Sequence, residues 1–139
     1  MNEKKPPQKP TNLREYDCNL VINNQRFTKL EVSPYYEKHN KEYLEALEKK
    51  GIKLSERELS EKLITDDLIR EVLVPQLNGE ENIKVEGSYY QYTYYFAISY
   101  KGNGKAYKLV WCVASGESNV LGLMDCFRIR KYDKKKMKN

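Results

Sequence analysis

The chain has 139 residues, of which 40% are hydrophobic, 12% aromatic and 32% charged, and its formal net charge at pH 7 is +5. This length corresponds to one domain, and no apolar run approaches the roughly 18 residues that a membrane-spanning helix needs. The 12 tyrosines exclude a wholly disordered chain, because so many aromatic rings can build a core.

The positive charge is concentrated at the two ends of the chain. Residues 1–10 contribute +2 and residues 131–139 contribute +4, whereas residues 11–130 sum to −1. Within this central range, residues 37–81 carry −4 and residues 82–130 carry +3. We therefore predict three parts: a disordered basic and proline-rich tail (1–12), a single folded domain (13–130) and a lysine-rich tail (131–139).

The three cysteines, Cys18, Cys112 and Cys126, show no C-x-x-C spacing. An odd number of cysteines without this spacing is typical of neither a disulfide framework nor a zinc site. The polar N-terminus is followed by no apolar stretch, so no signal peptide is predicted. These features indicate a reducing compartment, and we expect a cytoplasmic protein without a membrane partner.

The first elements in chain order are a hairpin and a group of helices. Two β-rich segments flank Asn23-Asn24, and asparagine tolerates the positive φ that a type I′ turn requires. Ser33-Pro34 predicts a helix start, Ser55-Glu-Arg-Glu58 is a capping box, and Thr65 is a third possible start. The second and third helices are predicted either as separate helices or as one kinked helix.

From Ile83 onward the hydrophobic period changes to two, which predicts strands. In residues 90–100 the even positions are mostly tyrosine, and the odd positions from Gln91 to Ser99 form the predicted polar face. Asp125 falls on the apolar parity of the last strand, which indicates either a β-bulge near Gly122 or a buried and paired carboxylate. We predict an α+β fold: an N-terminal β-hairpin, two to three helices, then an antiparallel three- to four-stranded meander with the helices packed on one face.

The chain contains one histidine, His39, and no spacing typical of a metal site, a phosphate-binding glycine loop or a serine hydrolase. We therefore predict no metal and no cofactor. The polar parity of the predicted sheet combines cations, hydroxyls and one aromatic ring, which suit phosphates and bases. The predicted RNA-binding residues are Tyr95, Thr93, Ser99, Lys108 and Arg130. Metal-independent RNA cleavage needs a proton-transfer group and a phosphate clamp, and we assign these catalytic roles to His39 and Arg128.

Three stretches in order carry a family resemblance: Tyr36-Glu-Lys-His39, Leu77-Asn-Gly-Glu80 and Val120–Arg130. With a three-strand meander before the last of them, the chain resembles the small RelE- and BrnT-like ribonuclease toxins of the barnase–EndoU–colicin–RelE group over roughly residues 16–130. The resemblance implies helices on an antiparallel sheet whose open face cleaves RNA without a metal. It also implies catalytic roles for His39 and Arg128. The acidic helical segment 45–63 has no obvious counterpart in that group.

Other functions remain open from the residues alone. The acidic helical half and the basic sheet half also suit a non-enzymatic protein-interaction module, such as an effector, an anti-defence inhibitor or an antitoxin-like partner. A non-catalytic RNA- or DNA-binding domain and a small-molecule-binding protein are further alternatives. The first hypothesis remains a metal-independent endoribonuclease toxin, with RNA or a protein as the partner.

Overall fold

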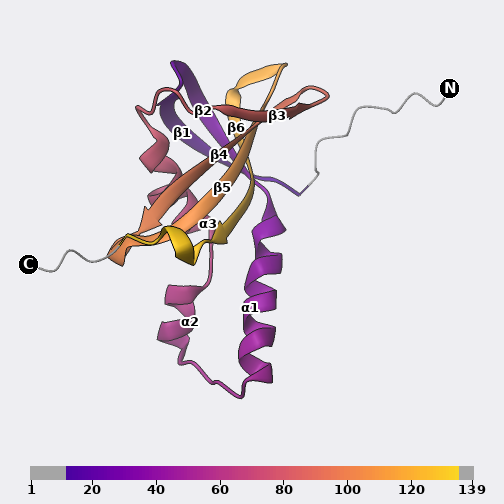
Figure 1. Cartoon of the computed structure of the whole chain (residues 1–139). Coiled ribbons are helices and arrows are strands. Elements are labelled where there is room, and N and C mark those ends of the chain that lie inside the picture. Colours follow the sequence, from indigo (N-terminus) through magenta and orange to yellow (C-terminus); the bar gives the residue numbers. More distant parts are fainter. Residues whose placement is uncertain (1–11, 135–139) are drawn as a thin grey trace, which may run out of the picture.

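The computed structural model describes residues 12–134, which form a six-stranded β-sheet with helices against one face and beyond one end (Figure 1). The strands are β1 (Arg14–Ile22), β2 (Gln25–Val32), β3 (Val85–Tyr89), β4 (Tyr92–Lys101), β5 (Lys105–Ala114) and β6 (Glu117–Arg128). The helices are α1 (Glu37–Lys49), α2 (Glu56–Lys62) and α3 (Asp66–Leu68), with shorter helical turns η1 (Pro34–Tyr36), η2 (Ile69–Leu73), η3 (Val74–Leu77), η4 (Gly102–Gly104) and η5 (Arg130–Tyr132). This architecture confirms the predicted α+β class.

The sheet joins the predicted hairpin to the predicted meander. The strands lie in the order β1-β2-β6-β5-β4-β3, and every neighbouring pair but one is antiparallel. The exception is β2 with β6, which run parallel with Leu30 opposite Leu121 and Val32 opposite Leu123. The prediction of an antiparallel sheet is therefore wrong at this junction. Periodicity shows which residues of a strand face the core, but not which distant strand pairs with it.

The predicted hairpin turn and helix starts are confirmed. Asn23 and Asn24 both adopt positive φ, at 52° and 63°. The side-chain oxygens of Ser33, Ser55 and Thr65 each accept a hydrogen bond from a backbone N–H two or three residues further along the chain. The second and third helices are separate, because Leu63 is extended between them. Local capping chemistry thus determines where these helices begin.

The helical segment from Asp66 to Leu77 packs on one face of the sheet and closes the core. Its fully or almost fully buried side chains are Leu68, Ile69, Leu73, Val74 and Leu77. They meet large side chains from the strands, which are Phe27, Leu30, Tyr107, Leu109, Trp111, Leu121 and Leu123. The Ser99 hydroxyl, at 0% exposure, donates to the Leu73 carbonyl at 2.8 Å, so a polar group inside this core is satisfied.

The predicted orientation of β4 is wrong: its odd positions face the core. Tyr95 stacks on Trp111, with ring centroids 4.2 Å apart and an angle of 12° between the planes. The even positions, which include Phe96 at 39% exposure, lie on the opposite face. The core side of β4 carries small residues such as Ala97 and Ser99, because the helical segment approaches it closely and β5 supplies the bulk. A count of aromatic residues along one strand therefore indicates the wrong face.

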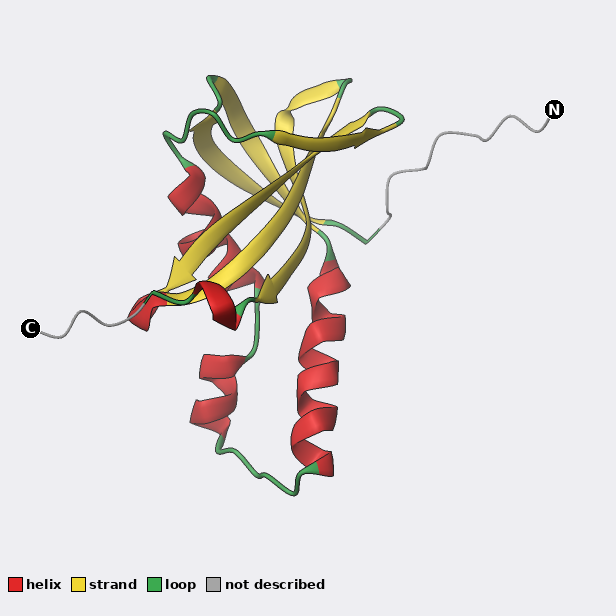
Figure 2. Cartoon of the chain, viewed as in Figure 1, coloured by secondary structure: helices red, strands yellow, loops and turns green. Residues whose placement is uncertain are grey.

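Helices α1 and α2 extend past the end of the sheet (Figure 2). Neither helix contains a fully buried residue. We call residues 37–62 the helical arm. It contains seven basic and seven acidic residues, so the −4 of residues 37–81 comes from residues 63–81.

The two predicted tails lie mostly outside the described residues, which exclude 1–11 and 135–139. The described beginning of the second tail is part of the fold. Arg130–Tyr132 form the turn η5, and the Asp133 carboxylate accepts a hydrogen bond from the backbone N–H of Ala106 at 2.8 Å.

Candidate active site

A cavity of about 560 Å³ lies where the first half of α1 meets the ends of β5 and β6. Its lining residues come from four parts of the chain: His39, Asn40 and Tyr43 from α1, Lys62 and Ile64 from the end of α2 and the linker after it, Lys105 and Tyr107 from β5, and Arg128, Arg130 and Asp133 from the C-terminal end. The cavity brings together the two predicted catalytic residues, His39 and Arg128. We call it the basic cavity.

The lining of the basic cavity carries more positive than negative charge. Lys62, Lys105, Arg128 and Arg130 are opposed by Asp133 alone among its lining carboxylates. The pKa of Lys105 is lowered, first by its hydrogen-bond interaction with Lys62, then by burial and by repulsion from neighbouring cations. Cations that depress one another's ionisation in this way form a site that favours an anion.

His39 is held by a carboxylate that the prediction did not assign to the site. The imidazole Nε2 lies 2.8 Å from Asp125 Oδ1, and Asp125 also accepts the backbone N–H of Cys126. A carboxylate only accepts, so the Nε2–H donates, and in the neutral ring the lone pair is on Nδ1. The ring also lies against Phe127, with centroids 5.5 Å apart. With its side chain 29% exposed, His39 remains accessible from the solvent.

A β-bulge brings Asp125 to His39. Trp111 pairs with Leu123 and Val110 pairs with Asp125, so Met124 is an extra residue in β6. The bulge reverses the parity of the strand beyond it, which places Cys126 in the core and Asp125 on the other face. The predicted bulge is confirmed two residues from Gly122. The alternative of a buried and paired carboxylate is met only in the pairing, because the Asp125 side chain is 20% exposed. The only sequence signal for this residue was its position on the apolar parity.

Arg128 has partners within the chain. Its two terminal nitrogens donate to the two carboxylate oxygens of Asp133, with Nη2 and Oδ2 2.7 Å apart, and Nη1 also donates to the Ala106 carbonyl. The hydrogen bond from Arg128 is the main reason that the pKa of Asp133 is lowered to about 2. The guanidinium holds the C-terminal turn against β5. Among residues 12–134, the cavity cations that form no ion pair are therefore Lys62, Lys105 and Arg130 rather than Arg128.

The predicted RNA-binding residues do not gather on one surface. Arg130 lines the basic cavity. Tyr95, Thr93 and Ser99 face the core, contrary to the predicted polar face. Lys108 lies on the opposite face, where its Nζ is 4.0 Å from the centroid of the Phe96 ring. Lys62 and Lys105 were missed, because nothing in a linear sequence shows that two distant lysines converge.

The described residues offer neither a metal site nor a reactive thiol. No group of three His, Cys, Asp or Glu side chains within residues 12–134 is placed to hold a metal ion. The three cysteines are free thiols, and burial raises the pKa of Cys112 to about 11 and that of Cys126 further. These buried thiols are therefore poor nucleophiles at neutral pH. None of the described helices is long and apolar enough to cross a membrane.

Comparison with known proteins leaves the site to be interpreted from its own geometry. No protein-family model, curated protein or solved structure matches this chain.

The basic cavity combines three chemical capabilities. A histidine oriented by a carboxylate can take up or release a proton. Two lysines and an arginine beside it can neutralise a bound anion. The Tyr43 side chain adds an aromatic surface on the α1 wall.

Proposed function

We propose that the chain is a metal-independent endoribonuclease that binds the phosphate backbone of RNA in the basic cavity. The observation that carries this proposal is the convergence of Lys62, Lys105 and Arg130 with His39 in one cavity. Crowded lysines repel one another, and a phosphate group removes that repulsion by forming charge-assisted hydrogen bonds.

The arrangement supplies the groups that RNA cleavage needs. His39 Nδ1 accepts the proton of the ribose 2′-hydroxyl, which then attacks the adjacent phosphorus and expels the 5′-oxygen. Lys62 and Lys105 stabilise the extra negative charge on the phosphorane. Asp125 holds the imidazole orientation and stabilises its protonated form. Asp125 is therefore a positioning residue. The Lys105 ammonium donates a proton to the departing 5′-oxygen, so the products are a 2′,3′-cyclic phosphate and a free 5′-hydroxyl.

The resemblance to the RelE- and BrnT-like toxins points to the same chemistry. It rests on the order of the elements and on a few short stretches, and His39 is the residue that both lines of argument share. We assign the role of phosphate clamp, predicted for Arg128, to Lys62, Lys105 and Arg130 instead, because Asp133 already balances the charge of Arg128.

Cleavage of a single-stranded RNA in the presence of EDTA tests the proposal. We expect His39→Ala to lower the rate by about 10²- to 10⁴-fold, the range of a general acid–base group, with RNA binding largely retained. The doubly substituted Lys62→Gln/Lys105→Gln variant should flatten the slope of log affinity against log salt by about 1.4, at about 0.7 per phosphate contact. Lys29→Gln is the matched control, because this exposed lysine lies in β2 and does not line the basic cavity.

Two results would contradict the proposal. One is RNA cleavage that His39→Ala leaves unchanged; the other is cleavage of DNA of the same sequence, which lacks the attacking 2′-hydroxyl. Salt-dependent binding with no cleavage by the parent chain would identify a non-catalytic nucleic-acid-binding domain instead.

A second candidate function, a protein-interaction module, is favoured by the helical arm. The arm presents Leu44 at 40% exposure and Ile52 at 45% exposure, beyond the end of the sheet. Contiguous apolar surface on a projecting element marks a partner-binding site, and Leu44 and Ile52 are the candidate residues for such a surface on the arm. Absence of RNA binding by the parent chain would favour this candidate over the first.

A further inference from the structure

A second cavity, of about 430 Å³, lies on the face of the sheet opposite the helical segment, near the β3–β4 hairpin. Three tyrosines contribute to its lining: Tyr89, Tyr92 and Tyr94. The thiol of Cys112 and the thioether of Met124 lie beside them, and this volume is within the usual range for small-molecule sites. We call it the tyrosine pocket.

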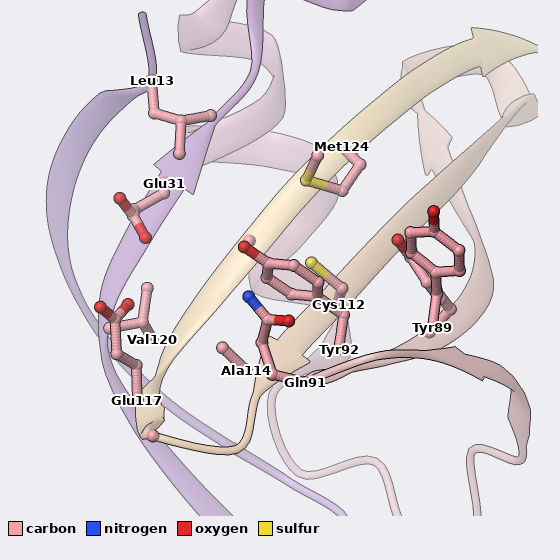
Figure 3. A pocket seen from close by; sticks show the side chains of 13 residues that line it. Leu13, Glu31, Tyr89, Gln91, Tyr92, Cys112, Ala114, Glu117, Val120 and Met124 are labelled. Atoms are coloured by element: carbon pink, nitrogen blue, oxygen red, sulfur yellow. The ribbon is translucent and has the colours of Figure 1, made fainter. Parts of the chain in front are cut away.

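The charged groups of the tyrosine pocket are of one sign. Glu31 and Glu117 line it, and no lysine or arginine does so among the described residues. Figure 3 shows the two carboxylates on one side of the pocket, Tyr89 on the other side and the ring of Tyr92 between them. Glu31 also lies directly opposite Glu15 across the β1–β2 pair, so negative charge is concentrated on this side. The pKa of Cys112, raised mainly by burial, is raised further by the charge of Glu31.

Gly122 leaves space at the base of the pocket because it has no side chain. A Cβ atom at this position would lie 3.2 Å from Cys112 Sγ and 3.9 Å from Met124 Sδ. Gly122 also pairs with both Glu31 and Cys112, so it occupies the point where the acidic side and the sulfur atoms meet. A side chain here would occupy space between the carboxylates and the rings.

We propose that the tyrosine pocket binds an organic cation, with the ammonium group near Glu31 and Glu117 and the apolar part among the tyrosine rings. The faces of aromatic rings attract cations, and carboxylates at the same site add direct charge attraction. A neutral ligand of the same shape gains neither contribution, and an anion is repelled. The pocket lies near Ala114 and Glu117, at the opposite end of β5 and β6 from Lys105 and Arg128 of the basic cavity. It carries the opposite charge, so the two sites select different ligands.

The cation can belong to a free small molecule or to a lysine side chain. One source of lysines is the chain itself, because Lys4, Lys5 and Lys9 precede Leu13, which lines the pocket. The two sources share one chemistry, and an experiment on the full chain distinguishes them.

Benzyltrimethylammonium is the probe, and its binding is followed by calorimetry and by the amide chemical shifts of Gly116 and Gly122. We expect saturable binding of the cation that shifts both amide signals. The neutral analogue, tert-butylbenzene, should bind with an affinity about tenfold lower or less. Tyr92→Ala and Glu117→Gln should each weaken binding of the cation several-fold. Phe96→Ala is the matched control, since this exposed ring lies on the same face and strand but outside the pocket.

Equal binding of the cation and its neutral analogue would overturn the proposal, as would loss of affinity in the Phe96→Ala variant alone. Because Glu31 is 5% exposed and its substitution can affect folding, the exposed Glu117 provides the carboxylate test. The full chain with Lys4→Gln, Lys5→Gln and Lys9→Gln separates the sources. Tighter probe binding in that variant identifies the chain's own lysines as the competing ligand, and unchanged binding identifies an external cation.

Discussion

Asp66 shows how much of the fold depends on one carboxylate at a helix start. It accepts hydrogen bonds from Arg14 Nε at 2.6 Å, from the Tyr16 hydroxyl at 2.6 Å and from the Tyr36 hydroxyl at 2.5 Å. Burial raises the pKa of Asp66, but these hydrogen bonds outweigh burial and lower it to about 2. The residue therefore ties β1, the turn η1 and the start of α3 together, and it is needed in its ionised form.

The Asp66 carboxylate predicts a pH dependence of stability. Its folded-state pKa of about 2 lies below the ordinary value of 3.8, so its contribution is complete above pH 4 and disappears as pH falls toward 2. We expect Asp66→Asn to lower the free energy of unfolding at pH 7 by about 2 kcal/mol, measured by urea denaturation. The difference between variant and parent should shrink below pH 4. Asp67→Asn, which removes an exposed ion pair with Arg70, is the control and should change stability little. A pH-independent difference would contradict this account.

At the scale of elements, side-chain amides attach the helices and loops to distant backbone. Asn40 on α1 donates to the Ile64 carbonyl at 2.7 Å and accepts the Ile64 N–H at 2.9 Å. Gln76 makes the same paired contact with Tyr100 in β4, and Asn23 makes it with Ile83. Each amide satisfies both the N–H and the C=O group of one backbone residue. The Asn40 contact also forms one wall of the basic cavity.

Removal of the Asn40 amide should loosen the helical arm. We expect Asn40→Ala to destabilise the chain by about 1 to 3 kcal/mol, since two hydrogen bonds are lost and the buried backbone of Ile64 is left unsatisfied. Hydrogen exchange at the Ile64 amide should accelerate in parallel. Asn40→Asp, which keeps an acceptor but loses the donor, should fall between the parent and Asn40→Ala. Asn19→Ala, which removes an exposed contact with Arg26, is the control. Unchanged exchange at Ile64 would show that other contacts hold the arm.

At the scale of the whole molecule, charge and apolar surface are distributed over separate regions. The basic cavity lies at one end of the sheet, the tyrosine pocket lies on its uncovered face, and the helical arm is electrically neutral in sum. The net charge of +5 therefore says little about any one of these surfaces. An arm with equal numbers of opposite charges can pair with a second copy of itself without net repulsion.

The protein-interaction candidate predicts that the arm mediates association between copies of the chain. Light scattering over a range of protein concentrations should show a mass that rises for the parent and remains that of a monomer for Leu44→Ser/Ile52→Ser. The control Val85→Ser removes an apolar side chain, 57% exposed, from the sheet and should behave as the parent. If the parent chain remains monomeric at every concentration, the arm does not mediate self-association.

The sequence by itself determined the features that depend on neighbouring residues. The Asn23-Asn24 turn, the caps at Ser33, Ser55 and Thr65, and the α+β order are local consequences of backbone and side-chain chemistry. These features recur wherever the same residues occur at the same spacing.

Only the tertiary structure decided which side chains of β4 face the core, that β2 pairs in parallel with β6, and which residues line the basic cavity. Tyr95 turns inward because Trp111 and the helical segment offer it a packing partner, which strand periodicity does not contain. The meeting of His39 with Asp125 depends on one extra residue in β6 and on a helix residue that lies 86 positions earlier in the chain. Lys62 of α2 and Lys105 of β5 also meet only because the whole chain folds back on itself. Interactions between distant segments depend on the path of the whole chain, so a linear pattern identifies the candidates but not their partners.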